Sequence, residues 1–151
     1  MDRAQGWRLR PAVAEDAAAC AAIFDDWVEA TDWMPRVHEA GDVERHYREH
    51  VLAVCAVTVA EAGGRVAGFL ALDPEGLVGG LYLAPEARGR GLGKALLDAA
   101  KLLRPEGLTL WTFVANAGAR RFYAREGFVE VGGTQGENEE GLADLLLAWK
   151  P

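Results

Sequence analysis

Apolar residues in the first third of the chain recur at the spacing of an α-helix. The positions i, i+3, i+4 and i+7 are filled by Cys20, Ile23, Phe24 and Trp27. This period predicts a helix over about residues 14–30 with one buried face. A second, more polar helix is expected from about Asp42 to His50. Pro35 separates the two, because the residue before a proline is biased away from helix.

Most of the remaining chain alternates between β-rich apolar runs and turns. The runs expected to form strands are 7–10, 55–61, 66–72, 77–83, 108–114, 128–131 and 142–149. Gly63 and Gly64 join two of them and indicate a hairpin. Helices follow the fourth and fifth strands; the first of these has an apolar stripe of Leu92, Ala95, Leu96, Ala99 and Leu103. This order predicts an α/β fold with a mixed sheet and helices on both faces.

The segment between the fourth strand and the next helix is rich in glycine and cations. Its sequence after Pro85 is Glu-Ala-Arg-Gly-Arg-Gly-Leu-Gly-Lys, ending at Lys94. Glycine lets the main chain approach a ligand closely, and the first N–H groups of a helix have no internal partner and lie at its positive end. The segment is therefore expected to hold a pyrophosphate.

Two common nucleotide motifs do not fit this segment. A P-loop needs glycine where Arg88 stands and Ser or Thr where Ala95 stands. The dinucleotide motif needs a third glycine, but Lys94 or Leu96 occupies that position. The remaining pattern, Arg-x-x-Gly-x-Gly over residues 88–93, resembles the acetyl-coenzyme A signature of the GCN5-related N-acetyltransferases (GNAT).

A second segment, over residues 116–128, resembles the same family. It reads Asn-Ala-Gly-Ala-Arg-Arg-Phe-Tyr-Ala-Arg-Glu-Gly-Phe and follows the fifth strand, so Asn116 is also suited to cap a helix and Gly127 to end it. The two signatures occur in the family's order, and the resemblance extends from about Arg8 to Trp149. It implies one GNAT domain over residues 1–151, with a mostly antiparallel sheet of about seven strands, splayed in the middle, and about four helices.

The resemblance also implies a reaction and a set of site residues. Acetyl-CoA, without a metal, would donate its acetyl group directly to a primary amine. The backbone of strand 77–83 would bind pantetheine, the Leu81 N–H would stabilise the oxyanion, and Tyr123 would stand at the sulfur. The residues expected to bind the cofactor are Leu81, Tyr82, Leu83, Arg88, Gly89, Arg90, Gly91, Leu92, Gly93, Lys94, Asn116 and Tyr123. The alternative role of Tyr123 is that of a core aromatic, next to Phe122.

The acceptor side of the site is less defined by the sequence. The residues expected to contact the acceptor are Trp33, Met34, His38 and Glu75. Asp73, Glu75 and Glu61 are candidate general bases, although each also suits a turn or the surface, and ordered water is the alternative. Consecutive Gly79 and Gly80 predict a bulge in their strand.

Charge and cysteine content narrow the range of partners. The net charge of −7 disfavours nucleic acid and suits a cationic amine, either a small molecule or a peptide. No apolar run reaches the roughly 20 residues of a membrane span. Cys20 and Cys55 lie among apolar residues, which favours reduced thiols and the cytoplasm. The sequence leaves open whether the protein forms a homodimer. The alternative to an enzyme is a non-catalytic module that senses acyl-CoA.

Overall fold

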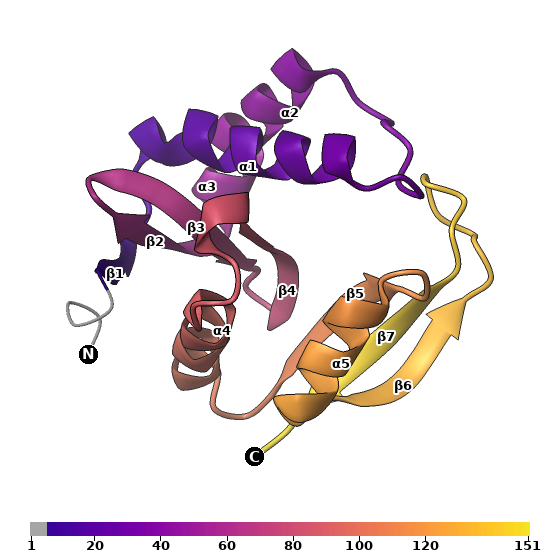
Figure 1. Cartoon of the computed structure of the whole chain (residues 1–151). Helices are drawn as coiled ribbons and strands as arrows, with labels where there is room; N and C mark the ends of the chain where they lie inside the picture. Colours follow the sequence, from indigo (N-terminus) through magenta and orange to yellow (C-terminus); the bar gives the residue numbers. More distant parts are fainter. Residues whose placement is uncertain (1–5) are drawn as a thin grey trace.

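The computed structural model describes residues 6–151, which share one seven-stranded sheet (Figure 1). The strands are β1 (Trp7–Pro11), β2 (Ala56–Ala62), β3 (Arg65–Leu72), β4 (Leu77–Leu83), β5 (Leu108–Phe113), β6 (Val129–Thr134) and β7 (Asp144–Trp149). Their order is β1-β2-β3-β4-β5-β7-β6; β4 and β5 pair in parallel, and the other described neighbours are antiparallel. This confirms the mixed, mostly antiparallel sheet expected from the sequence.

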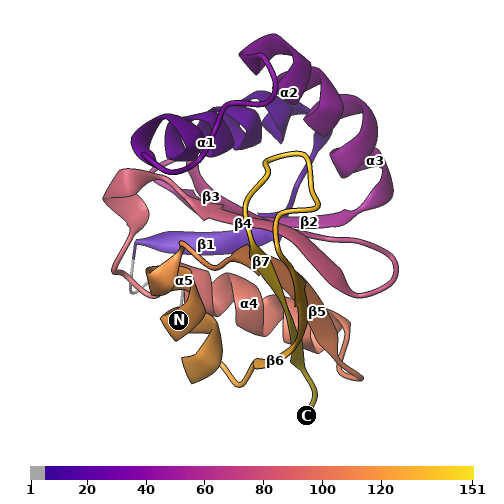
Figure 2. The same cartoon turned by 90° about the vertical axis from the view of Figure 1, so that its right-hand side faces the viewer.

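Helices cover both faces of this sheet, as predicted. They are α1 (Ala17–Ala30), α2 (Ala40–His46), α3 (Leu52–Val54), α4 (Leu92–Leu103) and α5 (Ala117–Arg125). Figures 1 and 2 place α1 and α2 on one side of β1–β4 and α4 on the other. A π-helical turn, Tyr47–Val51, joins α2 to α3. The second helical region therefore extends beyond His50, because no glycine or proline interrupts it. Within residues 6–151, no helix is both long and apolar enough to cross a bilayer.

The sheet is split between β4 and β5. The two strands pair only at Leu77 with Thr109 and at Val78 with Leu110. Beyond these pairs they diverge, which confirms the expected splay (Figure 1). On the other edge of β4, Gly80 pairs with Ala71 while Val78 pairs with Leu72. One strand residue, Gly79, is therefore left over, and the predicted bulge is confirmed.

Two apolar clusters hold the helices to the sheet. One lies under α1 and α2 around the fully buried Phe69, and the other lies between α4 and the sheet. The buried residues of α4 are Leu92, Leu96, Leu97 and Ala100. Leu103, predicted in the stripe, is 55% exposed. The buried face is centred on Leu96 and Ala100, so Leu103 falls at its margin in the last helical turn.

The asymmetry of α4 can be tested by two leucine truncations. Leu96 is fully buried in the cluster beneath α4, whereas Leu102 is 83% exposed. We expect Leu96→Ala to lower the free energy of unfolding by about 2–5 kcal/mol, because it leaves a cavity. Leu102→Ala should change it by less than about 0.5 kcal/mol. Urea denaturation measures both, and equal losses would contradict this packing.

Candidate active site

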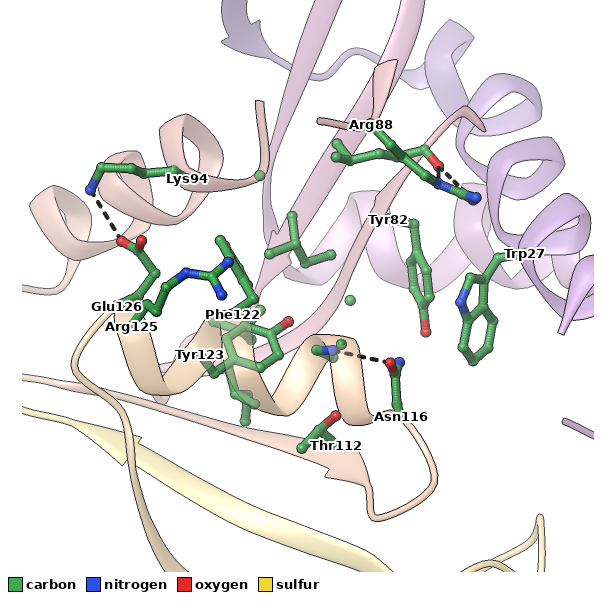
Figure 3. A pocket seen from close by; sticks show the side chains of 18 of the residues that line it. Trp27, Tyr82, Arg88, Lys94, Thr112, Asn116, Phe122, Tyr123, Arg125 and Glu126 are labelled. Carbon is green, nitrogen blue, oxygen red and sulfur yellow. Dashed lines mark hydrogen bonds and ion pairs between the residues drawn. The ribbon is translucent and has the colours of Figure 1, made fainter. Parts of the chain in front are cut away.

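A cavity of about 740 Å³ occupies the split between β4 and β5 (Figure 3). Its walls come from β4, β5, the start of α4 and one side of α5. The two GNAT-like segments, about thirty residues apart in the sequence, therefore face the same space.

The glycine-rich turn brings unpaired main-chain donors to the cavity. Gly89 and Gly91 both line it and have φ values of +75° and +82°, which disfavour other residues. Gly91 is the N-cap of α4, and the first internal bond runs from the Ala95 N–H to its carbonyl. The three preceding N–H groups of α4 thus lack helical partners. A Cβ built on Gly91 meets nothing within 4 Å, so the turn leaves room for a ligand.

The cations around this turn are held by partners within the protein. Arg88 donates from Nε and Nη2 to the Leu83 carbonyl at 3.3 and 3.1 Å, so it shapes the turn. Lys94 Nζ lies 3.1 Å from Glu126 Oε1, and hydrogen bonding to Glu126 raises the pKa of Lys94. Arg125 lines the same end of the cavity (Figure 3) and was missed from the sequence. The position of Arg125 inside the second GNAT-like segment was the available signal.

Two of the predicted cofactor residues, Arg90 and Leu92, do not line the cavity. Leu92 is buried under α4, where it anchors the first helical turn to the sheet. The side chain of Leu92 therefore contributes to packing, and only its main-chain N–H, in the first turn of α4, is left to contact a cofactor.

The edge of β4 that faces the cavity carries unpaired main-chain groups. The Ala84 N–H donates to the Ala67 carbonyl on β3 at 2.8 Å. Main-chain groups alternate between the two edges of a strand, so those of Tyr82 also face β3, while those of Leu81 and Leu83 face the split. Because Arg88 occupies the Leu83 carbonyl, the Leu81 N–H and carbonyl are placed to meet a ligand.

The side chains of α5 complete the middle of the cavity. Asn116 Oδ1 accepts a hydrogen bond from the Ala119 N–H at 3.1 Å, which confirms Asn116 as the N-cap of α5. Tyr123 is 9% exposed and lies against Phe128, while its hydroxyl is directed into the cavity (Figure 3). Burial, and secondarily the nearby Tyr82, raises the pKa of Tyr123. Tyr123 therefore packs in the core and also presents a protonated hydroxyl.

The predicted acceptor residues are only partly brought together. Trp33 lies edge-on to Phe113 with ring centroids 5.7 Å apart, and Phe113 lines the main cavity. Met34 and His38 line a separate cavity of about 40 Å³ beside it. Glu75 lies in the turn between β3 and β4, outside both cavities.

None of the three candidate bases lines the main cavity. Asp73 Oδ1 accepts hydrogen bonds from the main-chain N–H groups of Glu75 and Leu77, so it holds a turn. Glu61 pairs with Arg8 and Arg10 on β1. Among the described residues, the carboxylate that does line the cavity belongs to Glu126, which is paired with Lys94.

Several cavity residues were not identified as site residues from the sequence. Trp27 lines the cavity although its helical period indicated only a core position, and Thr112 and Phe113 line it from β5. The side chain of Tyr82 also enters the cavity, whereas the sequence assigned Tyr82 a main-chain role (Figure 3). Within residues 6–151, no group of three or more His, Cys, Asp or Glu side chains is arranged to hold a metal ion.

These features define a class of protein. Helix-terminal donors and cations at one end suit a diphosphate, and the open strand edge with a protonated tyrosine suits a reactive acyl group. The fold and cavity are those of an acyltransferase that uses a coenzyme thioester.

Comparison with known proteins agrees with this class. Residues 53–130 match the acetyltransferase (GNAT) domain model, and the chain belongs to this family. It is 28% identical over 131 residues to the peptidyl-lysine N-acetyltransferase YiaC of Escherichia coli (strain K12), covering 85% of this chain and 88% of that protein. The protein is an acetyl-CoA-dependent N-acetyltransferase.

Solved structures share the fold over nearly the whole chain. A GCN5-related N-acetyltransferase from Rhodopseudomonas palustris has a TM-score of 0.78 and 26% identity, covering 95% of each chain. YncA from Salmonella typhimurium, solved with its cofactor acetyl-CoA, has a TM-score of 0.73 and 22% identity, covering 95% of this chain and 93% of that one. At this identity the second likeness is one of fold.

The glycine turn can be tested with a matched pair of substitutions. Gly91 and Gly64 have similar φ values, +82° and +77°, and neither would bring a Cβ within 4 Å of another group. We expect both Gly91→Leu and Gly64→Leu to cost about 1–2 kcal/mol of stability, because each forces a left-handed conformation. Only Gly91→Leu should lose acetyl-CoA binding in calorimetry. Wild-type affinity in that variant would exclude the turn as the binding site.

Proposed function

We propose that the cavity binds acetyl-CoA with its diphosphate at the start of α4 and its thioester beside Leu81. The acetyl group then passes directly to a primary amine of a small molecule or of a peptide or protein. The observation that carries this proposal is the unpaired edge of β4, which lies between the glycine turn and Tyr123. The relative in Escherichia coli is named for peptidyl-lysine, which supports including protein lysines among the acceptors.

The main chain of β4 stabilises the transition state. Acetyl-CoA supplies the activated acetyl group. As the amine nitrogen bonds to the carbonyl carbon, the Leu81 N–H donates to the developing oxyanion. A fixed donor of this type costs no reorganisation during the reaction. The Leu81 N–H belongs to a strand held by β3 on its other edge, so its position is rigid.

Tyr123 assists departure of the sulfur. Its raised pKa keeps the hydroxyl protonated near neutral pH, so it can donate to the thiolate as the carbon–sulfur bond breaks. Tyr123 regains a proton from water if it passes its own to the sulfur. Over the whole reaction, one proton leaves the amine and one reaches the thiol.

The amine's proton passes to water instead of a dedicated side chain. The cavity carboxylate, Glu126, is already paired with Lys94, and the candidate bases Asp73, Glu75 and Glu61 lie elsewhere. This supports the ordered-water alternative from the sequence. Asn116 lines the cavity, its Oδ1 is used by the helix cap, and it is proposed to bind pantetheine through its amide nitrogen.

Three further features are part of this proposal. Residues 1–151 are proposed to form one domain, since all described strands share one sheet. The free cysteines Cys20 and Cys55 support a cytoplasmic location. A homodimer is proposed through edge strand β6, where Val129 and Val131 are exposed.

The role of Tyr123 can be tested by removing its hydroxyl. We expect Tyr123→Phe to lower kcat by about a hundredfold or more, the usual contribution of a positioned acid. The affinity for acetyl-CoA should stay within about twofold, because the ring still packs on Phe128. The assay is acetyl-CoA-dependent thiol release with an amine panel. Tyr47→Phe, which removes a buried hydroxyl outside the cavity, is the control. Equal kcat in the two variants would remove Tyr123 from the mechanism.

The dependence of kcat/KM on pH follows from the acceptor amine and from Tyr123. Only the neutral amine attacks, so kcat/KM for an alkylamine of pKa about 10.4 should rise about tenfold per pH unit between pH 6.5 and 9. Tyr123 must stay protonated, and because its pKa lies above the usual 10.0, no fall is expected below pH 10. Initial rates, corrected for non-enzymatic thioester hydrolysis, measure this profile. A plateau that begins near pH 7 would indicate a dedicated base.

A further inference from the structure

The end of the cavity away from Lys94 and Arg125 is built from aromatic rings. We name five of them the aromatic wall: Phe24, Trp27, Trp33, Tyr82 and Phe113. Their ring centroids follow one another at 5.2 Å (Phe24–Tyr82), 5.3 Å (Tyr82–Trp27), 5.8 Å (Trp27–Trp33) and 5.7 Å (Trp33–Phe113). The aromatic wall thus connects β4, through Tyr82, to β5, through Phe113.

Part of this wall faces the ligand space. Trp27, Tyr82 and Phe113 line the main cavity, while Phe24 and Trp33 pack behind them. Figure 3 shows Trp27 beside Tyr82, across the cavity from Lys94, Arg125 and Glu126. The rings are held edge-on or tilted to one another, so each is fixed by its neighbours.

The β6–β7 loop brings negative charge to the same end, where it meets the loop that follows α1. His38, after α1, lies 3.1 Å from Glu139 in the β6–β7 loop and joins the two loops. The next residue, Glu140, lines the small cavity together with Phe24. Burial raises the pKa of Tyr82 to about 12, and the charge of Glu140 contributes to the rise. Glu140 is therefore close enough to act on this end of the cavity.

The loop that follows α1 also carries a cation, Arg36, which is paired with acidic residues of α1. Arg36 pairs with Asp25 at 3.2 Å and with Glu29 at 3.7 Å. Within the described residues, the main cavity's basic side chains are Arg88, Lys94 and Arg125, all from the segments around the glycine turn and α5. The aromatic end thus presents π faces to the main cavity, and an acidic residue, Glu140, lines the small cavity that Phe24 also lines.

We propose that the aromatic wall and Glu140 form the subsite that binds the acceptor, selecting a primary ammonium at the end of an unbranched alkyl chain. This inference rests on the proposed acetyl transfer. Trp and Tyr faces attract a cation and also cover an alkyl chain, and the attraction strengthens when water is excluded. Glu140 adds charge attraction from the loop side and disfavours acceptors with a carboxylate next to the amine.

The geometry explains how such an acceptor would reach the thioester. Tyr82 follows Leu81 in β4, and its side chain points to the opposite face of the strand. An ammonium held against Tyr82 is therefore next to Leu81, whose N–H is proposed to face the acetyl carbonyl. The site would receive the acceptor as a cation, and loss of its proton to water would convert it to the nucleophile.

The test uses acceptor kinetics at saturating acetyl-CoA, with Nα-acetyl-lysine methylamide as the probe. We expect Trp27→Leu to raise the KM of the probe about tenfold, and Trp27→Phe, which keeps a ring, to raise it less than about threefold. Glu140→Gln should raise KM about threefold at low salt and less at 0.5 M salt. Glu49→Gln, an exposed residue of the helical turn after α2 that lines neither cavity, is the matched control and should change nothing.

Calorimetry with acetyl-CoA separates this inference from the proposed function. All four variants should bind acetyl-CoA within about twofold of wild type. If wild type acetylates the probe but Trp27→Leu and Glu140→Gln leave its KM unchanged, the subsite is wrong and acetyl transfer stands. If wild type binds acetyl-CoA but acetylates no amine in a panel, both proposals are overturned. Glu140→Gln, in a surface loop, gives a result even if Trp27→Leu fails to fold.

Discussion

The separation of β4 from β5 is the constraint on which the site depends. Two residue pairs hold the strands together, and beyond them one edge of each strand lacks a neighbour. Buried main-chain donors and acceptors left without partners are costly, so such an edge favours a ligand that can replace the missing strand. The bulge at Gly79 lies where the strands begin to diverge, and antiparallel pairing with β3 holds the following residues of β4 beside the cavity. The fold thus creates a ligand site by leaving a sheet incomplete.

This incomplete sheet gives the cavity two chemically different ends. The start of α4 points its positive end at one side, where Lys94 and Glu126 tie α4 to α5 and keep the two GNAT-like segments together. The other end is lined by the aromatic wall, which runs from β4 to β5 and takes two of its rings, Phe24 and Trp27, from α1. In the proposed binding mode, the diphosphate of acetyl-CoA lies at the end with the helix start and the acyl group lies toward the aromatic wall. The difference in charge between the two ends favours this orientation.

The sequence predicted those features of the fold that depend on short segments of the chain. The succession of strands and helices along the chain, the hairpin at Gly63 and Gly64, the bulge and the Asn116 cap each depend on a few adjacent residues. Trp27 and Phe113 were missed because their role depends on two elements, far apart in the chain, that meet at the split. Helical periodicity identifies an apolar face but cannot distinguish packing on a sheet from lining a cavity. Leu103 was misplaced for a related reason, since the centre of a helix face is set by what it packs against. Glu75 was singled out because it lies near the start of the strand expected to splay, but the turn it occupies lies outside the cavity.

The proposed reaction centre and the proposed acceptor subsite differ in how amino-acid substitutions would affect them. At the centre, the Leu81 N–H is a main-chain group, so substitution of the side chain leaves the donor in place as long as β3 and β4 pair. At the proposed acceptor end, by contrast, binding depends on side chains, which come from β4 and β5, from α1 and from two loops that His38 and Glu139 join at the surface. Substitutions there can alter the acceptor without disturbing the strands that hold the thioester. On the proposed roles, such a fold can keep one reaction while its substrate varies, because the chemistry rests on a main-chain group and the selection rests on side chains.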